Sequence, residues 1–399
     1  MKCPTCSADH PDSTKFCSAC GQPLSHPPVQ IRVSRLALAS MALALICLVP
    51  SIFFSILMNY IRLFPSYIES SLLFCFLVGP LLAILFGSVG LSNMSGTGGT
   101  LTGKGYAATG ITVACITIVM GIILPAFSRM RQLAFLSTCG SSLSGIGKAM
   151  LIYSNDYEDE LPKAGGRANS WVKVLPGGWE AVNRNDAFNI RNNKGQVTVT
   201  SSLYLLVKYA DVTPRQFICT NNTDVTEFML SSVKQPLPQN FQFSDAWDFG
   251  PYVDDANNPS SHCSYSYHWP FDEYALTMAS DSSMVIAADR NPWMPPARPQ
   301  EKYAWENFKP DNEYWKGITA TAKMGNTQNH GLDGQNVLYV DSHIRFEQRS
   351  FCGVNNDNIY TPSESEDPTQ KSTKGLRPVR FDMSPTNKPK SKLDSYLVQ

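Results

Sequence analysis

The sequence predicts an α+β protein with a small cysteine-rich N-terminal domain, three apolar helices that cross a membrane, and a larger C-terminal domain with an antiparallel sheet. Three observations lead to this prediction. Four of the eleven cysteines lie at or before Cys20. Three long stretches of the first third contain no charged residue. All seven tryptophans lie between Trp171 and Trp315, so the large aromatic core belongs to the C-terminal half.

The charge balance bears on the partners. Lysine plus arginine equals aspartate plus glutamate, at 33 each in 399 residues. A chain with no net charge has no overall field that attracts a polyanion. We therefore expect no nucleic-acid partner.

The N-terminal segment "CPTCSADHPDSTKFCSACGQPL" contains two Cys-x-x-Cys pairs. Four thiolates on two tight turns are the ligands of a structural, tetrahedral zinc site. We therefore predict a zinc ribbon over residues 1–25, followed by a linker over 26–35. Two disulfides or a redox pair is the competing interpretation, although redox motifs accompany βαβ patterns that this segment lacks. The predicted ligands are Cys3, Cys6, Cys17 and Cys20.

The charge-free stretches predict a membrane domain over residues 36–127, with spans at 36–58, 71–91 and 107–127. Each is long enough to cross about 30 Å of hydrocarbon at about 1.5 Å per residue. Basic residues precede the first span, whereas the loop after it carries only Arg62. The spans would lie in the lipid bilayer. The positive-inside rule then places the N-terminus in the cytoplasm and the C-terminal half outside.

The third span continues into an amphipathic pattern without a loop. After Pro125 the apolar positions recur at alternating spacings of three and four, which makes one stripe on a helix. We therefore predict a spine helix over 128–157 that packs on the sheet of an external domain over 128–361. A helix that simply belongs to the C-terminal domain predicts nearly the same structure. The stripe consists of Leu136, Cys139, Leu143, Ile146, Met150, Tyr153 and Tyr157.

Several of these segments resemble known families. The stretch "ILPAFSRMRQLAFLSTCGSSLSGIGKAMLIYSNDYEDELP" resembles the N-terminal helix of pseudopilins, specifically the planctomycete-type pseudopilin-like family with a C-terminal His-x9-Asp-Gly signature. "CSYSYHWPF" and "NHGLDGQNVLYVDSHIRFEQRSFCGVNNDNIYT" resemble the closing segments of that family. Residues 35–120 resemble a small bacterial membrane domain of unknown function. The resemblance implies a pilin-like spine helix and a multi-pass protein of the bacterial inner membrane with a periplasmic C-terminal domain. Lys104 and Ala108 replace the phenylalanine and glutamate of the prepilin cleavage motif.

The segment "NVLYVDSHIRF" predicts a hairpin with Asp341–Ser342 as its two-residue turn. In that register Tyr339 faces Ile344, and the two strands share one apolar face. Ser342 occupies a turn position that favours positive φ.

Two kinds of metal site are candidates in the C-terminal half. Imidazole and carboxylate donors suit zinc or manganese, and the competing interpretation is a turn aspartate with polar hairpin positions. Oxygen-rich loops at 254–261 and 355–358 suit calcium, and the competing interpretation is a pair of solvated turns. The candidate zinc or manganese ligands are His330, Asp333, Asp341 and His343.

The four cysteines of the C-terminal half allow three disulfide connectivities. Sequence neighbourhood favours Cys139 with Cys219 and Cys263 with Cys352. From Pro362 onward the chain is rich in Pro, Ser, Thr and Lys, so residues 362–399 are predicted to be a disordered tail.

Together these features predict a non-enzymatic, membrane-anchored, pseudopilin-like protein of cell-envelope assembly or of a type II secretion-like apparatus. It would have protein partners and would form homo-oligomers. One alternative is an external metal-binding or metal-dependent hydrolytic domain. Another is a transmembrane signalling protein with a cytoplasmic zinc ribbon. No Gly-x-Ser-x-Gly motif is present, so the sequence favours no enzyme.

Overall fold

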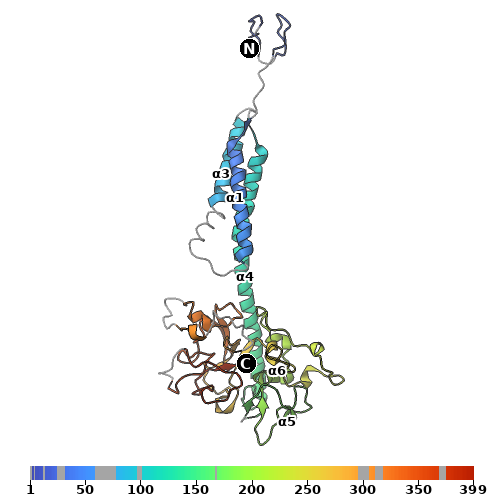
Figure 1. Ribbon diagram of the computed structural model, residues 1–399, viewed down its shortest axis with the longest axis vertical. Coiled ribbons are helices and arrows are strands. Elements are labelled where there is room, and N and C mark those ends of the chain that lie inside the picture. Colours follow the sequence, from blue (N-terminus) through green and yellow to red (C-terminus); the bar gives the residue numbers. More distant parts are fainter. Residues whose placement is uncertain are drawn as a thin grey trace. The chain divides into compact units, whose positions relative to one another are not determined.

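A computed structural model of the protein shows a mixed α and β fold (Figure 1). It divides into two compact units, Met1–Met130 and Arg131–Gln399. The structure describes residues 2–3, 5–11, 14–24, 32–58, 78–96, 101–166, 169–294, 305–310, 318–367 and 374–399.

The first unit contains α1 (Arg35–Met58), α3 (Gly79–Gly96) and the N-terminal half of α4 (Lys104–Asp156). Two short strands, β1 (Arg32–Val33) and β2 (Leu101–Thr102), pair in parallel.

Small residues let these helices approach closely. Ala44, Ala83 and Ala114 form a buried cluster. The Ser40 hydroxyl donates a hydrogen bond to the carbonyl of Ala83 over 2.7 Å. A Cβ atom at Gly110 would lie 2.9 Å from the backbone nitrogen of Met41, so only glycine fits at this helix contact.

The structure contradicts the predicted membrane spans. Within the described ranges no helix combines the length and the apolarity needed to cross a bilayer. Spans at 36–58, 71–91 and 107–127 are therefore wrong, and so is the multi-pass inner-membrane location with a periplasmic C-terminal domain. Residues 71–77 of the second span lie outside the described residues.

For the second predicted span, the described residues contain helix α3. Its 18 residues reach about 27 Å at about 1.5 Å per residue, less than the roughly 30 Å of a hydrocarbon core. Its last turns carry Ser92, Asn93 and Ser95. The small apolar residues of these stretches lie in contacts between helices, whereas large ones such as Ile46, Leu85 and Val119 are exposed.

The second unit contains a five-stranded antiparallel sheet in the order β8-β7-β6-β5-β9. Its other elements are α5 (Arg184–Ala187), α6 (Val199–Tyr209) and a parallel pair formed by β3 (Ser170–Trp171) and β4 (Gln196–Val197). Short 3₁₀ turns such as Pro259–His262 connect these elements. The sheet strands are β5 (Tyr265–His268), β6 (Val285–Asp289), β7 (Gln335–Tyr339), β8 (Ile344–Glu347) and β9 (Leu397–Val398).

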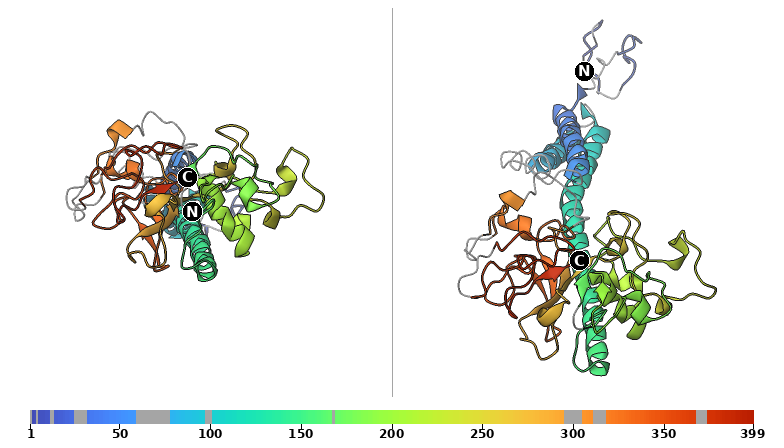
Figure 2. Two further views of the ribbon diagram at one scale, coloured as in Figure 1. Left: turned by 90° about the horizontal axis from the view of Figure 1, so that it is seen from below. Right: turned by 60° about the horizontal axis from the view of Figure 1, so that its bottom comes forward.

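The C-terminal half of α4 is the centre of this second unit. Leu143, Ile146, Met150 and Tyr153 are buried in its main apolar core. A Cβ atom at Gly147 would lie 2.8 Å from the Leu338 side chain, so the helix lies directly against β7. Segments 169–250, drawn in green, and the sheet with the C-terminal residues, drawn in orange and red, lie on opposite sides of this helix (Figures 1 and 2).

The predicted disordered tail is folded where the structure describes it. Strand β9 pairs with β5, and Tyr396 and Leu397 are fully buried. The apolar end "YLV" supplies burial that the polar composition of residues 362–399 conceals. Residues 368–373 lie outside the described residues.

The hairpin of β7 and β8 differs from its prediction by one residue. Leu338 pairs with Ile344, and the Tyr339 N–H donates to the carbonyl of His343 over 3.1 Å. The loop therefore has three residues and ends at Ser342, whose φ is +68°. A shift of one residue moves a side chain to the other face of a strand. Ile344 accordingly packs with Leu338 instead of with Tyr339.

Candidate functional site

The N-terminal cysteines lie on two turns of the same construction. The N–H of Ser7 donates to the carbonyl of Cys3 over 2.9 Å, and the N–H of Gly21 donates to the carbonyl of Cys17 over 2.8 Å. Ser7 and Gly21 both have positive φ, at +53° and +69°. Each turn thereby presents two cysteine side chains on one side.

The four sulfur atoms face one another. The Cys3 and Cys20 sulfurs lie 3.6 Å apart, and the Cys6 and Cys17 sulfurs lie 3.4 Å apart. All four lie within 4.8 Å of one another. A tetrahedral site with Zn–S bonds of about 2.3 Å has sulfur–sulfur edges of about 3.8 Å. The residues therefore fit a structural zinc ion.

His10 is a neighbour of this site. Its Nε2 atom lies 3.1 Å from the Cys17 sulfur. Four thiolates already complete a structural zinc shell, so His10 lies outside the ligand set and contacts it through Cys17.

The second predicted metal set is not brought together. His330 is buried against Asp289, Asp333 pairs with Lys323 over 2.9 Å, and His343 pairs with Asp341 on the exposed hairpin loop. No three of the four predicted side chains offer ligand atoms within 4.8 Å of one another among the described residues.

The oxygen-rich loops do not support calcium. The Asp254 carboxylate accepts hydrogen bonds from the side-chain amide of Asn257 and from the N–H groups of Asn257 and Ala256, and these bonds lower the pKa of Asp254. Asp255 pairs with Lys173 over 2.9 Å. No metal-binding group was found at 254–261 or 355–358 within the described part of the chain.

Cys139 and Cys219 form a disulfide, with 5.2 Å between their Cα atoms. It links α4 to the loop that follows the 3₁₀ turn at Pro214–Phe217. The other predicted pair is not bonded, because Cys263 and Cys352 are both free. Burial raises the pKa of the Cys263 thiol to about 12, so this side chain is an inert apolar residue.

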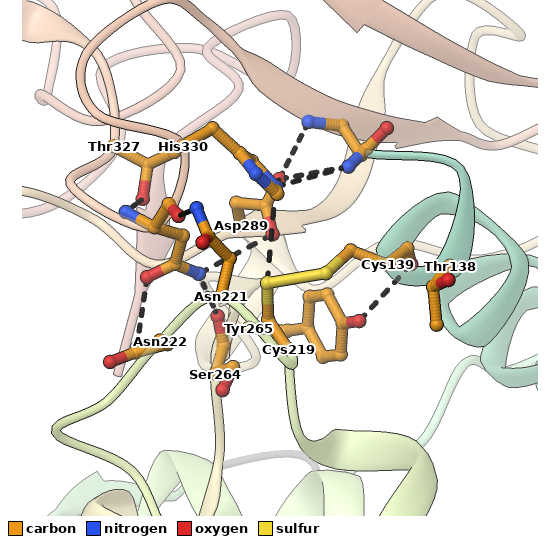
Figure 3. The surroundings of a disulfide bond; sticks show 12 residues. Thr138, Cys139, Cys219, Asn221, Asn222, Ser264, Tyr265, Asp289, Thr327 and His330 are labelled. Atoms are coloured by element: carbon orange, nitrogen blue, oxygen red, sulfur yellow. Dashed lines mark hydrogen bonds and ion pairs between the residues drawn. A yellow bond between two sulfur atoms is a disulfide. The ribbon is translucent and has the colours of Figure 1, made fainter. Parts of the chain in front are cut away.

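A buried polar cluster lies beside the disulfide (Figure 3). The Nε2 atom of His330 lies 3.0 Å from an oxygen of Asp289 and 3.9 Å from the sulfur of Cys219. The Asn336 N–H donates to the same Asp289 oxygen over 2.7 Å. Asp289 is fully buried, and within the described part of the chain the Nδ1 atom of His330 has no hydrogen-bond partner.

Sequence reasoning missed Asp289 and Asn336. Asp289 is the last residue of the apolar strand β6, "VIAAD". Asn336 lies in β7, which is the strand next to β6. A lone carboxylate at the end of an apolar strand was the available signal.

The cluster does not have the geometry of a catalytic triad. In a triad the carboxylate and the nucleophile contact opposite ring nitrogens of the histidine. Here Asp289 and Cys219 both lie near Nε2 of His330. Cys219 is also held in the disulfide, so it is no nucleophile in this state.

A separate cavity of about 180 Å³ lies between Trp179 and Asp248. The Thr198 hydroxyl donates to the Asp248 carboxylate over 2.5 Å. Burial raises the pKa of Asp248 to about 7, although hydrogen bonds from Thr198 and Phe249 oppose this shift. Asp248 therefore holds its proton more tightly than an exposed aspartate does.

Comparison with known proteins agrees with the N-terminal geometry. A zinc-ribbon family model matches residues 2–24. Together with the four converging cysteines, this match establishes a zinc-ribbon domain at the N-terminus. No curated protein and no solved structure matches the chain.

Proposed function

We propose that this protein is a non-enzymatic assembly subunit of the pilin-related type, as in a type II secretion-like apparatus, with its zinc ribbon as a docking module. The observation that carries the proposal is the construction of the second unit on α4. Cys139, Leu143, Ile146 and Met150 are each at most 1% exposed, and the helix lies against an antiparallel sheet. A long N-terminal helix that also forms the core of a sheet domain is the arrangement implied by the pseudopilin resemblance.

The helices of the first unit supply a surface for assembly. Ile46, Val49, Leu85 and Val119 are each more than 45% exposed. Exposed apolar side chains on helices are available for association with another protein surface. The proposed occupant is a second copy of this chain, because pilin-type helices assemble with one another.

The zinc ribbon suits docking better than catalysis. Four cysteine ligands close the metal shell and leave no position for a substrate. Phe16 is 63% exposed on the ribbon and offers an aromatic contact for a partner. A signalling role would use the same contact surface.

The hydrolytic alternative has less support. The described parts of the C-terminal unit contain no open cluster of three metal ligands, since the only such group there is the buried Cys139, Cys219 and His330. That group includes a disulfide, so it holds no reactive water in this state.

Cysteine crosslinking tests the assembly proposal. Cys115 is exposed on α4, whereas Cys47 is buried. In a zinc-loaded chain with Cys75→Ser, a short bismaleimide should link two copies through Cys115. The matched Cys115→Ser chain should give no linked species. Val119→Glu should abolish the link while leaving tryptophan fluorescence unchanged. A chain that stays monomeric at all concentrations would refute the proposal.

A further inference from the structure

The disulfide and the polar cluster beside it have the donors of a metal site. The sulfurs of Cys139 and Cys219 and a ring nitrogen of His330 lie within 4.8 Å of one another, and all three residues are buried. Asp289 adds a carboxylate oxygen 3.0 Å from His330 Nε2. We propose that reduction of the Cys139–Cys219 disulfide creates a second zinc site, with Cys139, Cys219, His330 and Asp289 as its ligands.

The distances suit tetrahedral zinc. Zinc bonds of about 2.3 Å to sulfur and about 2.0–2.1 Å to nitrogen or oxygen give a sulfur–nitrogen edge of about 3.5 Å and a nitrogen–oxygen edge of about 3.3 Å. The structure has 3.9 Å from Cys219 Sγ to His330 Nε2 and 3.0 Å from that nitrogen to Asp289 Oδ2. For zinc to bind all four side chains, the two sulfurs must separate and the Asp289 oxygen must approach them, because only Cys139, Cys219 and His330 already have ligand atoms within 4.8 Å of one another.

Contacts other than the disulfide hold Cys219 beside His330. Asn221 and Asn222, just after this cysteine, donate through their amides to the carbonyl and side-chain oxygens of Asn329 over 2.5 Å and 2.9 Å (Figure 3). Breaking the sulfur–sulfur bond leaves these hydrogen bonds in place.

Cys139 is held independently too. The Tyr265 hydroxyl donates to the carbonyl of Cys139 over 3.1 Å, and a Cβ atom on the neighbouring Gly140 would lie 3.2 Å from the Asn336 side chain. This part of α4 therefore stays against the polar cluster after reduction. Cys139 is thus held near the other proposed ligands before zinc binds.

The cluster also has the outer contacts that metal ligands need. Asn336 donates from both its N–H and its side-chain amide to Asp289 Oδ2, over 2.7 Å and 3.2 Å, and Asn329 donates to Oδ1 over 3.4 Å. Hydrogen bonds of this kind orient a ligating carboxylate. His330 would bind zinc through Nε2, whereas its buried Nδ1 atom has no hydrogen-bond partner among the described residues.

The chemistry balances with a dithiol as reductant. The dithiol transfers two electrons and two protons, so that its own disulfide forms, the Cys139–Cys219 bond breaks and two thiols result. Zinc then forms two sulfur bonds, and the thiols release two protons. Conditions that keep the ribbon cysteines reduced also favour this step, because disulfides persist only in oxidising surroundings.

Metal analysis of the full chain tests the site. Replacing Cys3, Cys6, Cys17 and Cys20 with serine removes zinc binding by the ribbon. This chain is then exposed to zinc chloride with and without a water-soluble phosphine, which reduces the disulfide. After removal of free metal, the oxidised chain should hold no zinc and the reduced chain about one zinc per molecule. Circular dichroism and thiol labelling verify the fold and the reduction.

Matched variants identify the ligands. His330→Gln should abolish the zinc of the reduced chain, whereas His343→Gln and the Cys263→Ser, Cys352→Ser pair should retain it. The proposal is overturned if the reduced, folded chain takes up no zinc, or if His330→Gln still holds it. Unfolding upon reduction in the presence of zinc would also overturn it, because the disulfide would then be purely structural.

Discussion

Replacing Ile146 with alanine tests whether α4 is the core of the second unit. Ile146 is 1% exposed and belongs to the main core. The change removes three carbon atoms, worth about 2.4 kcal/mol at about 0.8 kcal/mol each. An unfilled cavity of about 80 Å³ adds up to about 2 kcal/mol at roughly 24 cal/mol per Å³. We expect the free energy of unfolding to fall by about 2–4 kcal/mol.

Ile152 provides a matched control, because the same residue type lies on the same helix with 58% exposure. Ile152→Ala should change the free energy of unfolding by no more than about 0.5 kcal/mol. The gain in helix propensity is common to both variants and cancels in the comparison. Urea unfolding followed by tryptophan fluorescence reports on the second unit, since every tryptophan lies between Trp171 and Trp315. Equal losses for the two variants would refute the reasoning.

Three further predictions follow from the disulfide, the ribbon and the buried carboxylate. Replacing both Cys139 and Cys219 with serine removes a disulfide that joins residues 80 positions apart. The entropy of the unfolded chain then predicts that the free energy of unfolding in urea, without added zinc, falls by about 4.5 kcal/mol. An unchanged urea midpoint would contradict this. A chelator should unfold the zinc ribbon at residues 2–24, because the ribbon depends on its metal. The tryptophan fluorescence of the second unit should stay unchanged. Cys17→Ser should have the same two effects, and a shift in tryptophan emission would count against the prediction. The pKa of Asp248, raised to about 7 by burial, means that the folded protein holds this proton more tightly than the unfolded chain. Its contribution to stability is therefore lost as pH rises from about 4 to 7, by as much as roughly 4 kcal/mol, and Asp248→Asn should remove that part of the pH dependence; parallel curves for both proteins would argue against a buried, titrating Asp248.

The zinc ribbon and the helical stripe were predictable because each depends on local spacing. Two Cys-x-x-Cys turns need no distant partner, and the family match over residues 2–24 agrees with them. The structure buries the predicted stripe from Cys139 to Tyr153, whereas Leu136 is only half-buried and Tyr157 lies beyond the end of α4 with 36% exposure. Periodicity of this kind depends on few other parts of the chain.

Features set by distant contacts were not predictable. The hairpin loop has three residues instead of two, and Ser342 accommodates the positive φ that the longer loop requires. The tail forms β9 because Leu397 and Val398 pair with β5, which lies more than a hundred residues earlier in the chain. Polar composition alone could not show this.

The metal ligands illustrate the same limit. The sequence pattern groups His330 with its neighbour Asp333, whereas the fold places it beside Asp289 and Cys219. The charge-free stretches predict spans from apolarity alone, and apolarity does not distinguish lipid contact from contact between helices. The structure describes no helix there that meets the requirements of a span.

Hydrogen exchange of the full chain tests most directly whether the C-terminal half of α4 is the core on which the second unit is built. The account predicts that the amides of residues 143–153 exchange in the slowest class, together with those of β6 and β7, because opening them requires unfolding of the whole unit. Exchange of these helix amides as fast as in the exposed loop at 254–257, while β6 and β7 stay protected, would contradict it.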